Sequence, residues 1–95
     1  MCIKKIIGYC AVDSGQLLVA DPCYLDKWKG GDYGQYNDYT RACKTTSNED
    51  QGGEMVVSGS AGMGVVFSTG WGDGSYPVEA EYEDGRIKSI SITFF

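Results

Sequence analysis

The sequence predicts a mainly β protein of antiparallel strands, with a small α+β fold as the alternative. In residues 76–83, apolar residues alternate with a proline and three glutamates, which is the period of a strand with one buried face. The Asp84-Gly85 dipeptide that follows is the preferred two-residue turn of a C-terminal β-hairpin. Helix should be minor, since no stretch keeps a helical period over a window of about eleven residues. We therefore expect a compact antiparallel sheet, a sandwich or a partly open barrel.

Two strands are expected at the start of the chain. Residues 3–12 and 16–20 are apolar runs, and the turn-forming triplet at 13–15 between them indicates a hairpin. Pro22 should stop the second strand, because proline has no N–H to donate and biases its predecessor toward extended geometry. We therefore expect a structural break near Pro22.

The middle of the chain has weaker signals. Residues 26–38 are rich in Gly, Asp and Tyr without any period, which indicates a long ordered loop or a short irregular helix. Three further strands are expected, at residues 39–46, 54–58 and 63–68. Polar residues 47–53 and small residues 59–62 would connect them.

The C-terminal hairpin carries the most specific structural prediction. An unbroken ladder would set Glu83 against Arg86, Tyr82 against Ile87 and Glu81 against Lys88. Past Lys88 the next apolar residues stand at even positions, whereas Ile87 stands at an odd one, so in an unbroken strand they would point to the opposite face, into solvent. We therefore expect a one-residue β-bulge at residues 88–90. With the bulge, one apolar face is restored by three pairs: Ala80 with Ile90, Val78 with Ile92 and Tyr76 with Phe94.

Length and charge limit the function classes. Ninety-five residues indicate a single domain over residues 1–95. The net charge is −5 without any histidine, and eight scattered Lys and Arg form no basic stripe, which argues against duplex DNA or RNA as a partner. A small anionic ligand needs only one or two basic residues and some backbone N–H groups. No apolar stretch is as long as that of a signal peptide or a membrane span, so we expect a cytoplasmic protein without a membrane partner.

Cysteines and aspartates give no catalytic or metal-binding pattern. The four cysteines include no Cys-x-x-Cys pair, which predicts buried or half-buried structural thiols. A nucleophilic Cys23 would need an activating group such as a lysine or a helix N-terminus, because the chain has no histidine, and the sequence does not indicate one. Four aspartates could converge on Ca²⁺ or Mg²⁺, but their spacing does not resemble an EF-hand; they are Asp13, Asp21, Asp26 and Asp73. We expect neither a metal site nor a cofactor.

A glycine-rich segment at residues 68–74 is the first candidate site. Its three alternate glycines would let the backbone approach a ligand and turn N–H groups toward it. Asp73 could bind a cation or a hydroxyl, and Trp71 could stack on a ring. The segment lacks the lysine of a Walker loop, and a strand follows it where the dinucleotide fingerprint requires a helix. The alternative is a wide turn between strands with Trp71 as a lid over the core.

An aromatic segment is the second candidate site. Its rings are Tyr24, Trp28, Tyr33, Tyr36 and Tyr39. Glycines and the basic residues Lys27, Lys29 and Arg41 lie among or near them. Tyrosine and tryptophan with flexible glycines are typical of recognition surfaces, and their faces also stack on bases. The alternative is a loop that packs its own rings over a small core.

Several short motifs resemble a known family. They are Val-Asp-Ser-Gly at 12–15, Val-Ala-Asp-Pro-Cys-Tyr at 19–24, Ser-Thr-Gly-Trp-Gly-Asp-Gly-Ser-Tyr-Pro-Val at 68–78, Gly-Arg-Ile at 85–87 and Ile-Thr-Phe at 92–94. A similar pattern is found in a family of small uncharacterised bacteriophage and bacterial proteins, a domain of unknown function. The resemblance covers both ends of the chain and leaves out residues 26–62. It implies a phage-like origin and an accessory role.

We therefore expect a small phage-type accessory binding protein that acts in counter-defence in the cytosol of the bacterial host. It would sequester a small nucleotide-type ligand or mask a host or defence protein. If the partner is a nucleotide, Trp71 or the loop tyrosines would stack on its base, and the backbone amides of residues 70–74 with one basic residue would hold its phosphate. The basic candidates are Arg86, Arg41 and Lys44. The ligand-binding candidates are Trp71, Gly70, Gly72, Asp73, Gly74, Tyr76, Arg86, Tyr24 and Asp21.

Two other classes of function stay open. One is a small metal-dependent hydrolase with Asp21 and Asp73 as cation ligands. The other is a structural or virion-associated module without any ligand. Exposed strand edges or faces would also allow a homodimer.

Overall fold

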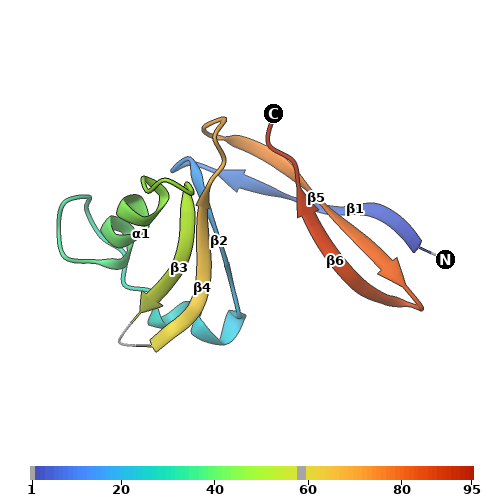
Figure 1. The fold of residues 1–95 in the computed structure, drawn as a ribbon, viewed down its shortest axis with the longest axis horizontal. Helices are drawn as coiled ribbons and strands as arrows, with labels where there is room; N and C mark the ends of the chain where they lie inside the picture. Colours follow the sequence, from blue (N-terminus) through green and yellow to red (C-terminus); the bar gives the residue numbers. More distant parts are fainter. Residues whose placement is uncertain (1, 58–59) are drawn as a thin grey trace. The chain divides into compact units, whose positions relative to one another are not determined.

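The computed structural model describes residues 2–57 and 60–95, which form two open three-stranded antiparallel sheets, one α-helix and one 3-10 helix. The elements are β1 (Cys2–Val12), β2 (Gln16–Ala20), the 3-10 helix η1 (Pro22–Lys27), α1 (Asp38–Thr46), β3 (Gly52–Val57), β4 (Ser60–Ser68), β5 (Gly74–Glu83) and β6 (Arg86–Ile92) (Figure 1). The strand orders are β1-β5-β6 and β2-β4-β3. The predicted mainly β class with little helix is confirmed.

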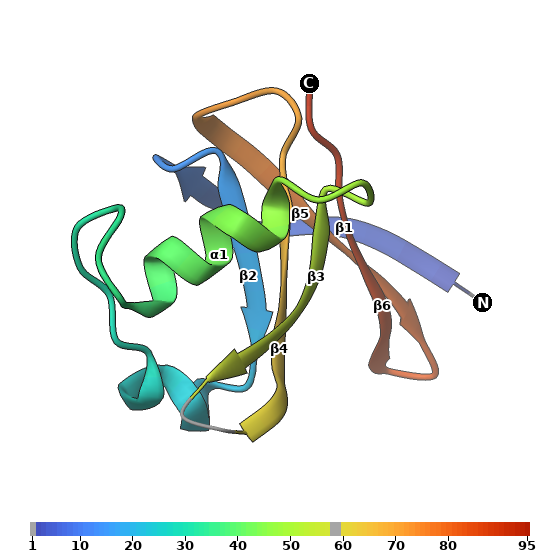
Figure 2. The ribbon, with the colours of Figure 1, turned by 60° about the vertical axis from the view of Figure 1, so that its left-hand side comes forward.

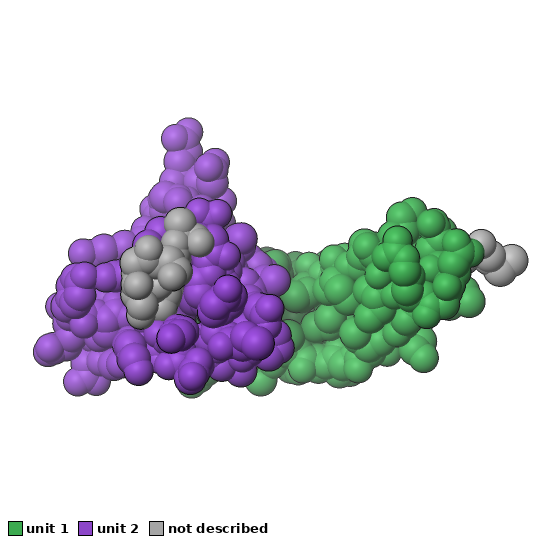
Figure 3. All heavy atoms as spheres, turned by 90° about the horizontal axis from the view of Figure 1, so that it is seen from below, with its two compact units in different colours: residues 1–15, 69–95 green, residues 16–68 purple. Residues whose placement is uncertain are grey.

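The chain divides into two compact units, which Figure 3 colours separately. The first unit, Met1–Gly15 with Thr69–Phe95, contains the β1-β5-β6 sheet. The second unit, Gln16–Ser68, contains the β2-β4-β3 sheet, η1 and α1. The single domain over residues 1–95 stays a prediction.

The second unit has a core between its sheet and its helix. Figure 2 shows α1 lying across one face of the β2-β4-β3 sheet. Ala42 from α1 packs there with Met55, Met63 and Val66, and both Met55 and Val66 are only 1% exposed. Partly buried Leu18, Ala20 and Trp28 extend this cluster. Side chains from both layers thus supply the unit's apolar interior.

The helix α1 corrects the predicted strand at residues 39–46. Its tyrosine and threonines favour a strand by propensity, but the residue before the helix caps it: Asn37 Oδ1 accepts a hydrogen bond from Thr40 N at 2.9 Å. Burial of Ala42 against the sheet stabilises the helix further. Tertiary packing and the cap outweigh propensity over this nine-residue stretch.

Other elements of the second unit follow the predictions closely. β2 ends at Ala20 and Pro22 begins η1, so the break near Pro22 is confirmed. Residues 28–37 contain no helix or strand, which agrees with the predicted long loop. The predicted strand at 63–68 lies within β4, and the one at 54–58 corresponds to β3 except for residue 58. Residues 58 and 59 lie outside the described residues. The predicted connections at 47–53 and 59–62 are too long, because residues 52–53 already belong to β3 and residues 60–62 to β4.

The predicted hairpin between the first two strands is wrong. Both strands exist, but β1 pairs with β5 and β2 pairs with β4, in different sheets. β1 has eleven residues and β5 has ten, whereas β2 has only five. Pairing with β5 therefore satisfies more backbone groups of β1 than a hairpin with β2 would.

The C-terminal hairpin has the predicted register and bulge. Glu83 pairs with Arg86 across the turn, and Ala80 pairs with Ile90 after a register shift that leaves Lys88 as the extra residue. Asp84 and Gly85 have φ values of 55° and 80°, as a type I′ turn requires.

The bulge also rearranges the predicted charged and aromatic pairs. Lys88 Nζ forms its ion pair with Glu83 Oε2 at 3.2 Å. Glu81 accepts instead from Ser89 Oγ at 3.1 Å. The ladder ends at the pair of Val78 and Ile92, and beyond it the predicted pair of Tyr76 and Phe94 meets as an edge-to-face ring contact with centroids 5.1 Å apart.

Candidate functional site

The loop between β4 and β5, residues 69–73, is organised around one buried hydroxyl, and we call it the Trp71 loop. Thr69 is 5% exposed, and its Oγ1 accepts from Gly72 N at 3.0 Å and from Trp71 N at 3.4 Å. The same hydroxyl lies 2.9 Å from Gly72 O, to which the Tyr76 hydroxyl donates at 2.7 Å. The loop is therefore held together by its own hydrogen bonds.

This arrangement changes what the Trp71 loop can bind. The N–H groups of Trp71 and Gly72 donate to Thr69, so they are not available to a phosphate. Trp71 is 69% exposed, so its interpretation as a lid over the core is wrong, whereas the wide turn between strands is confirmed. The loop thus exposes the indole ring to solvent on a backbone that is held by hydrogen bonds to Thr69 and Tyr76.

Arg86 does not meet the Trp71 loop within their shared unit. Gly74 begins β5 and Glu83 ends it, and Glu83 is paired with Arg86. Ten strand residues at about 3.3 Å per residue separate the two ends by roughly 30 Å. Of the predicted site residues outside the loop, Gly74 follows it directly as the first residue of β5, and buried Tyr76 supports it through its hydroxyl.

Asp21 and Tyr24 belong to the second unit, at the start of η1. Asp21 Oδ1 accepts from Cys23 N at 2.9 Å and thereby caps η1. Tyr24 is 42% exposed. The Trp71 loop belongs to the first unit.

The second unit brings together the aromatic ring of Tyr36 and the cations of Arg41 and Lys44. Arg41 and Lys44 lie three residues apart on α1 and therefore on one helix face. Arg41 Nη1 donates to Val56 O at 2.8 Å and lies 3.9 Å from Asp38 Oδ1. Its guanidinium carbon lies 4.9 Å from the centroid of the Tyr36 ring, and its Nη2 donates to the Tyr36 hydroxyl. These contacts orient Arg41.

A surface hollow of about 210 Å³ opens beside these residues, and we call it the cationic hollow. It is lined by Gly34, Gln35, Tyr36, Asn37, Thr40, Arg41 and Lys44, none of them acidic. Lys44 is exposed and forms no ion pair with a described residue. A neighbouring hollow of about 310 Å³ shares Arg41 and Lys44 but is also lined by Glu54.

The cationic hollow was missed because residues 39–46 were interpreted as a strand. In a strand, residues separated by an odd number point to opposite faces, whereas a helix places i and i+3 together. Asn37 followed by Asp38 is the signal that could have revealed the helix, as a capping residue before an acidic first turn.

The exposed tyrosines favour the recognition interpretation of the aromatic segment. Tyr33 is 69% exposed and Tyr36 is 90% exposed, whereas Trp28 packs on the core. The alternative, a loop that packs its own rings, therefore holds for Trp28 and fails for these two tyrosines.

All four cysteines are free thiols. Cys10 and Cys43 are half-buried as expected, but Cys2 and Cys23 are exposed, which corrects the prediction for those two. Local desolvation and the Glu83 carboxylate, which lies 3.6 Å from Cys2 Sγ, raise the pKa of the Cys2 thiol.

The described residues contain no group of three or more Cys, Asp or Glu placed to hold a metal ion. Residues 2–57 and 60–95 also include no helix long and apolar enough to cross a membrane.

Comparison with known proteins identifies the family. Residues 6–90 match the family model described as "Protein of unknown function (DUF4241)". The matched range includes the whole second unit and most of the first. No curated protein and no solved structure matches the chain. The chain therefore belongs to the DUF4241 family of proteins of unknown function.

Proposed function

We propose that this chain is a binding protein that sequesters a small nucleotide-type anion in the cationic hollow without altering it chemically. The supporting observation is that Tyr36, Arg41 and Lys44 line one hollow that has no acidic residue in its wall. A ring and two cations are the groups that bind a base and a phosphate.

Each of the three residues has a distinct role in this proposal. Arg41 is held by Val56 O and by Tyr36, so its remaining N–H groups are already oriented when a phosphate arrives. Lys44 adds an ammonium that forms no ion pair with a described carboxylate. Tyr36 is 90% exposed as a residue, and its ring offers a face on which a base stacks.

Size and charge favour a mononucleotide. The cationic hollow, at about 210 Å³, is smaller than the usual range of about 300–1,000 Å³ for drug-sized ligands. It suits a phosphate and part of a sugar, with the base resting outside on Tyr36. The net charge of −5 repels long polyanions, so two local cations suit a small anion better than a nucleic acid.

A calorimetric titration with mononucleotides and cyclic mononucleotides tests the proposal, with each ligand recovered afterwards and chromatographed. Lys44→Ala removes one charge-assisted contact and should weaken binding about tenfold. The matched control is Lys27→Ala, the same change at an exposed lysine outside the cationic hollow, which should leave the affinity unchanged. Absence of binding, or equal losses in both variants, would contradict the proposal. A chemically altered ligand would favour the hydrolase alternative.

Tyr36 provides an independent check on stacking. Tyr36→Ala should weaken nucleotide binding about tenfold, because base stacking on an aromatic ring is worth about 1–3 kcal/mol. Tyr36→Phe keeps the ring and loses only the hydroxyl that accepts from Arg41, so it should retain most of the affinity.

A second candidate function is the masking of a host or defence protein through the Trp71 loop. It is favoured by an indole that is 69% exposed on a loop fixed by Thr69 and Tyr76, since rigid exposed aromatics form binding hot spots. In a pull-down from bacterial host lysate, Trp71→Ala should abolish capture of the partner. Tyr33→Ala, which changes an aromatic ring of the same 69% exposure, is the control and should retain it. Equal capture by wild type and Trp71→Ala would remove Trp71 from the interface.

A further inference from the structure

The sheet of the first unit has one apolar face and one charged face. Directly paired residues of an antiparallel ladder point to the same side. Ile3, Tyr82 and Ile87 are paired in one row, and Lys5, Ala80 and Ile90 in the next row on the same face. The opposite face carries the row Lys4, Glu81, Ser89 and the row Cys2, Glu83, Arg86.

The unit's own residues cover only one end of the apolar face. Around Tyr76, which is 2% exposed, the rings of Phe94 and Phe95 pack edge to face. Toward the Asp84-Gly85 turn, Ile87 and Ile90 are 45% and 48% exposed, and Ile3 is 58% exposed. A three-stranded sheet normally buries such a face beneath a second layer.

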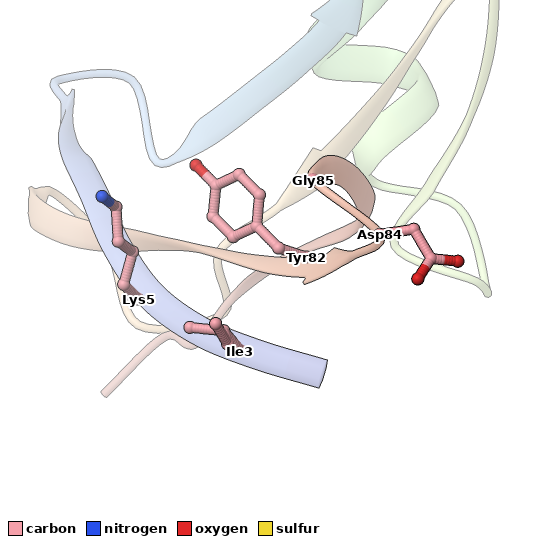
Figure 4. A pocket seen from close by; sticks show the side chains of 5 residues that line it. All are labelled: Ile3, Lys5, Tyr82, Asp84 and Gly85. Atoms are coloured by element: carbon pink, nitrogen blue, oxygen red, sulfur yellow. The ribbon is translucent and has the colours of Figure 1, made fainter. Parts of the chain in front are cut away.

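The exposed end of the face carries complementary charges on either side of an apolar centre. A hollow of about 270 Å³ is lined there by Ile3, Lys5, Tyr82, Asp84 and Gly85. Figure 4 shows Lys5 and Asp84 on opposite sides of Tyr82. Lys5 Nζ lies 5.9 Å from the centroid of the Tyr82 ring, and neither Lys5 nor Asp84 forms an ion pair with a described residue.

We propose that this apolar face binds the same face of a second copy of the chain. A two-fold axis through the apolar centre places Lys5 of each copy opposite Asp84 of the other, because isologous contacts are reciprocal. The exposed isoleucines of the two copies then cover one another as two sheet layers. The chain carries a net charge of −5, but the hollow on this face is lined by one cation and one anion, so charge repulsion opposes association through this face only weakly.

Sedimentation equilibrium from micromolar to millimolar concentration tests the dimer. Wild type should pass from the mass of one chain to twice that mass. Ile90→Ser should raise the dimer dissociation constant at least about tenfold, since it removes an apolar side chain at the centre of the contact. The matched control is Ile6→Ser, at an isoleucine 49% exposed that is paired with Glu79 and therefore lies on the opposite face. It should leave the dissociation constant unchanged.

A second pair of variants keeps the proposal testable if Ile90→Ser fails to fold, which circular dichroism would show. Lys5→Ala should raise the dissociation constant several-fold, and Lys4→Ala, on the charged face, should not. A monomer at every concentration would overturn the proposal. Equal weakening by the variants of the two faces would also overturn it.

Discussion

The two three-stranded sheets of this chain differ in how much of their apolar face is buried. The β2-β4-β3 sheet is covered by α1, and Met55 and Val66 beneath the helix are almost completely buried. The β1-β5-β6 sheet has no helix in its own unit, and Ile87 and Ile90 on its apolar face remain exposed. The second unit thus has an apolar cluster between a sheet and a helix, whereas the buried apolar residues of the first unit are Val12, Tyr76 and Ala80, which all lie on β1 and β5.

The largest effect is expected in the core of the second unit. Met55→Ala should lower the free energy of unfolding by about 2–5 kcal/mol, because it removes buried methylenes and leaves a cavity. Its neighbour Val56 is 45% exposed, and Val56→Ala should cost less than about 1 kcal/mol. Chemical denaturation measures both. Similar losses in the two variants would contradict a core located under α1.

A smaller effect is expected at the start of α1. Asn37→Ala should cost about 1–2 kcal/mol, because the bond from Thr40 N to the cap is lost together with the one from Asn37 Nδ2 to Asp32 O. Asn37→Asp keeps an accepting oxygen at the cap and should cost less. Thermal unfolding followed by circular dichroism distinguishes the two variants, and an unaffected alanine variant would show that the cap is unimportant.

The smallest effect is expected in the first unit. Tyr76→Phe should cost about 1 kcal/mol, because only the hydrogen bond from its hydroxyl to Gly72 O is lost. The Trp71 loop should also become more mobile, which lowers the fluorescence anisotropy of tryptophan. Tyr9→Phe, at a residue 66% exposed, is the control. Unchanged anisotropy in Tyr76→Phe would show that Thr69 alone holds the loop.

Local pattern sufficed for part of the fold. The bulge at Lys88 was predictable from the alternation of apolar and polar residues alone, because the apolar residues before and after Lys88 share one face only if one residue is extra. The wrong hairpin and the missed helix have another cause. The partner of β1 depends on which distant strand offers the longer ladder, and α1 depends on a sheet that covers Ala42. Neither fact is contained in the local sequence.

The candidate site shows the same limit. Trp71, Gly70 and Gly72 were predicted as site residues from the sequence, and the structure places them in an accessible turn between β4 and β5. The inward hydrogen bonds of Thr69 could not be read from glycine spacing. The pairing of Arg41 with Lys44 depended on the helix, so an error in one element concealed the grouping on which the proposed function rests.

The most direct test of that function is a nuclear magnetic resonance titration of the isotope-labelled chain with the mononucleotide that binds best. The account predicts chemical-shift changes concentrated at residues 34–45, with Tyr36, Arg41 and Lys44 among the largest, and little change at residues 69–73. Changes centred on residues 69–73, or no changes with any mononucleotide, would contradict it.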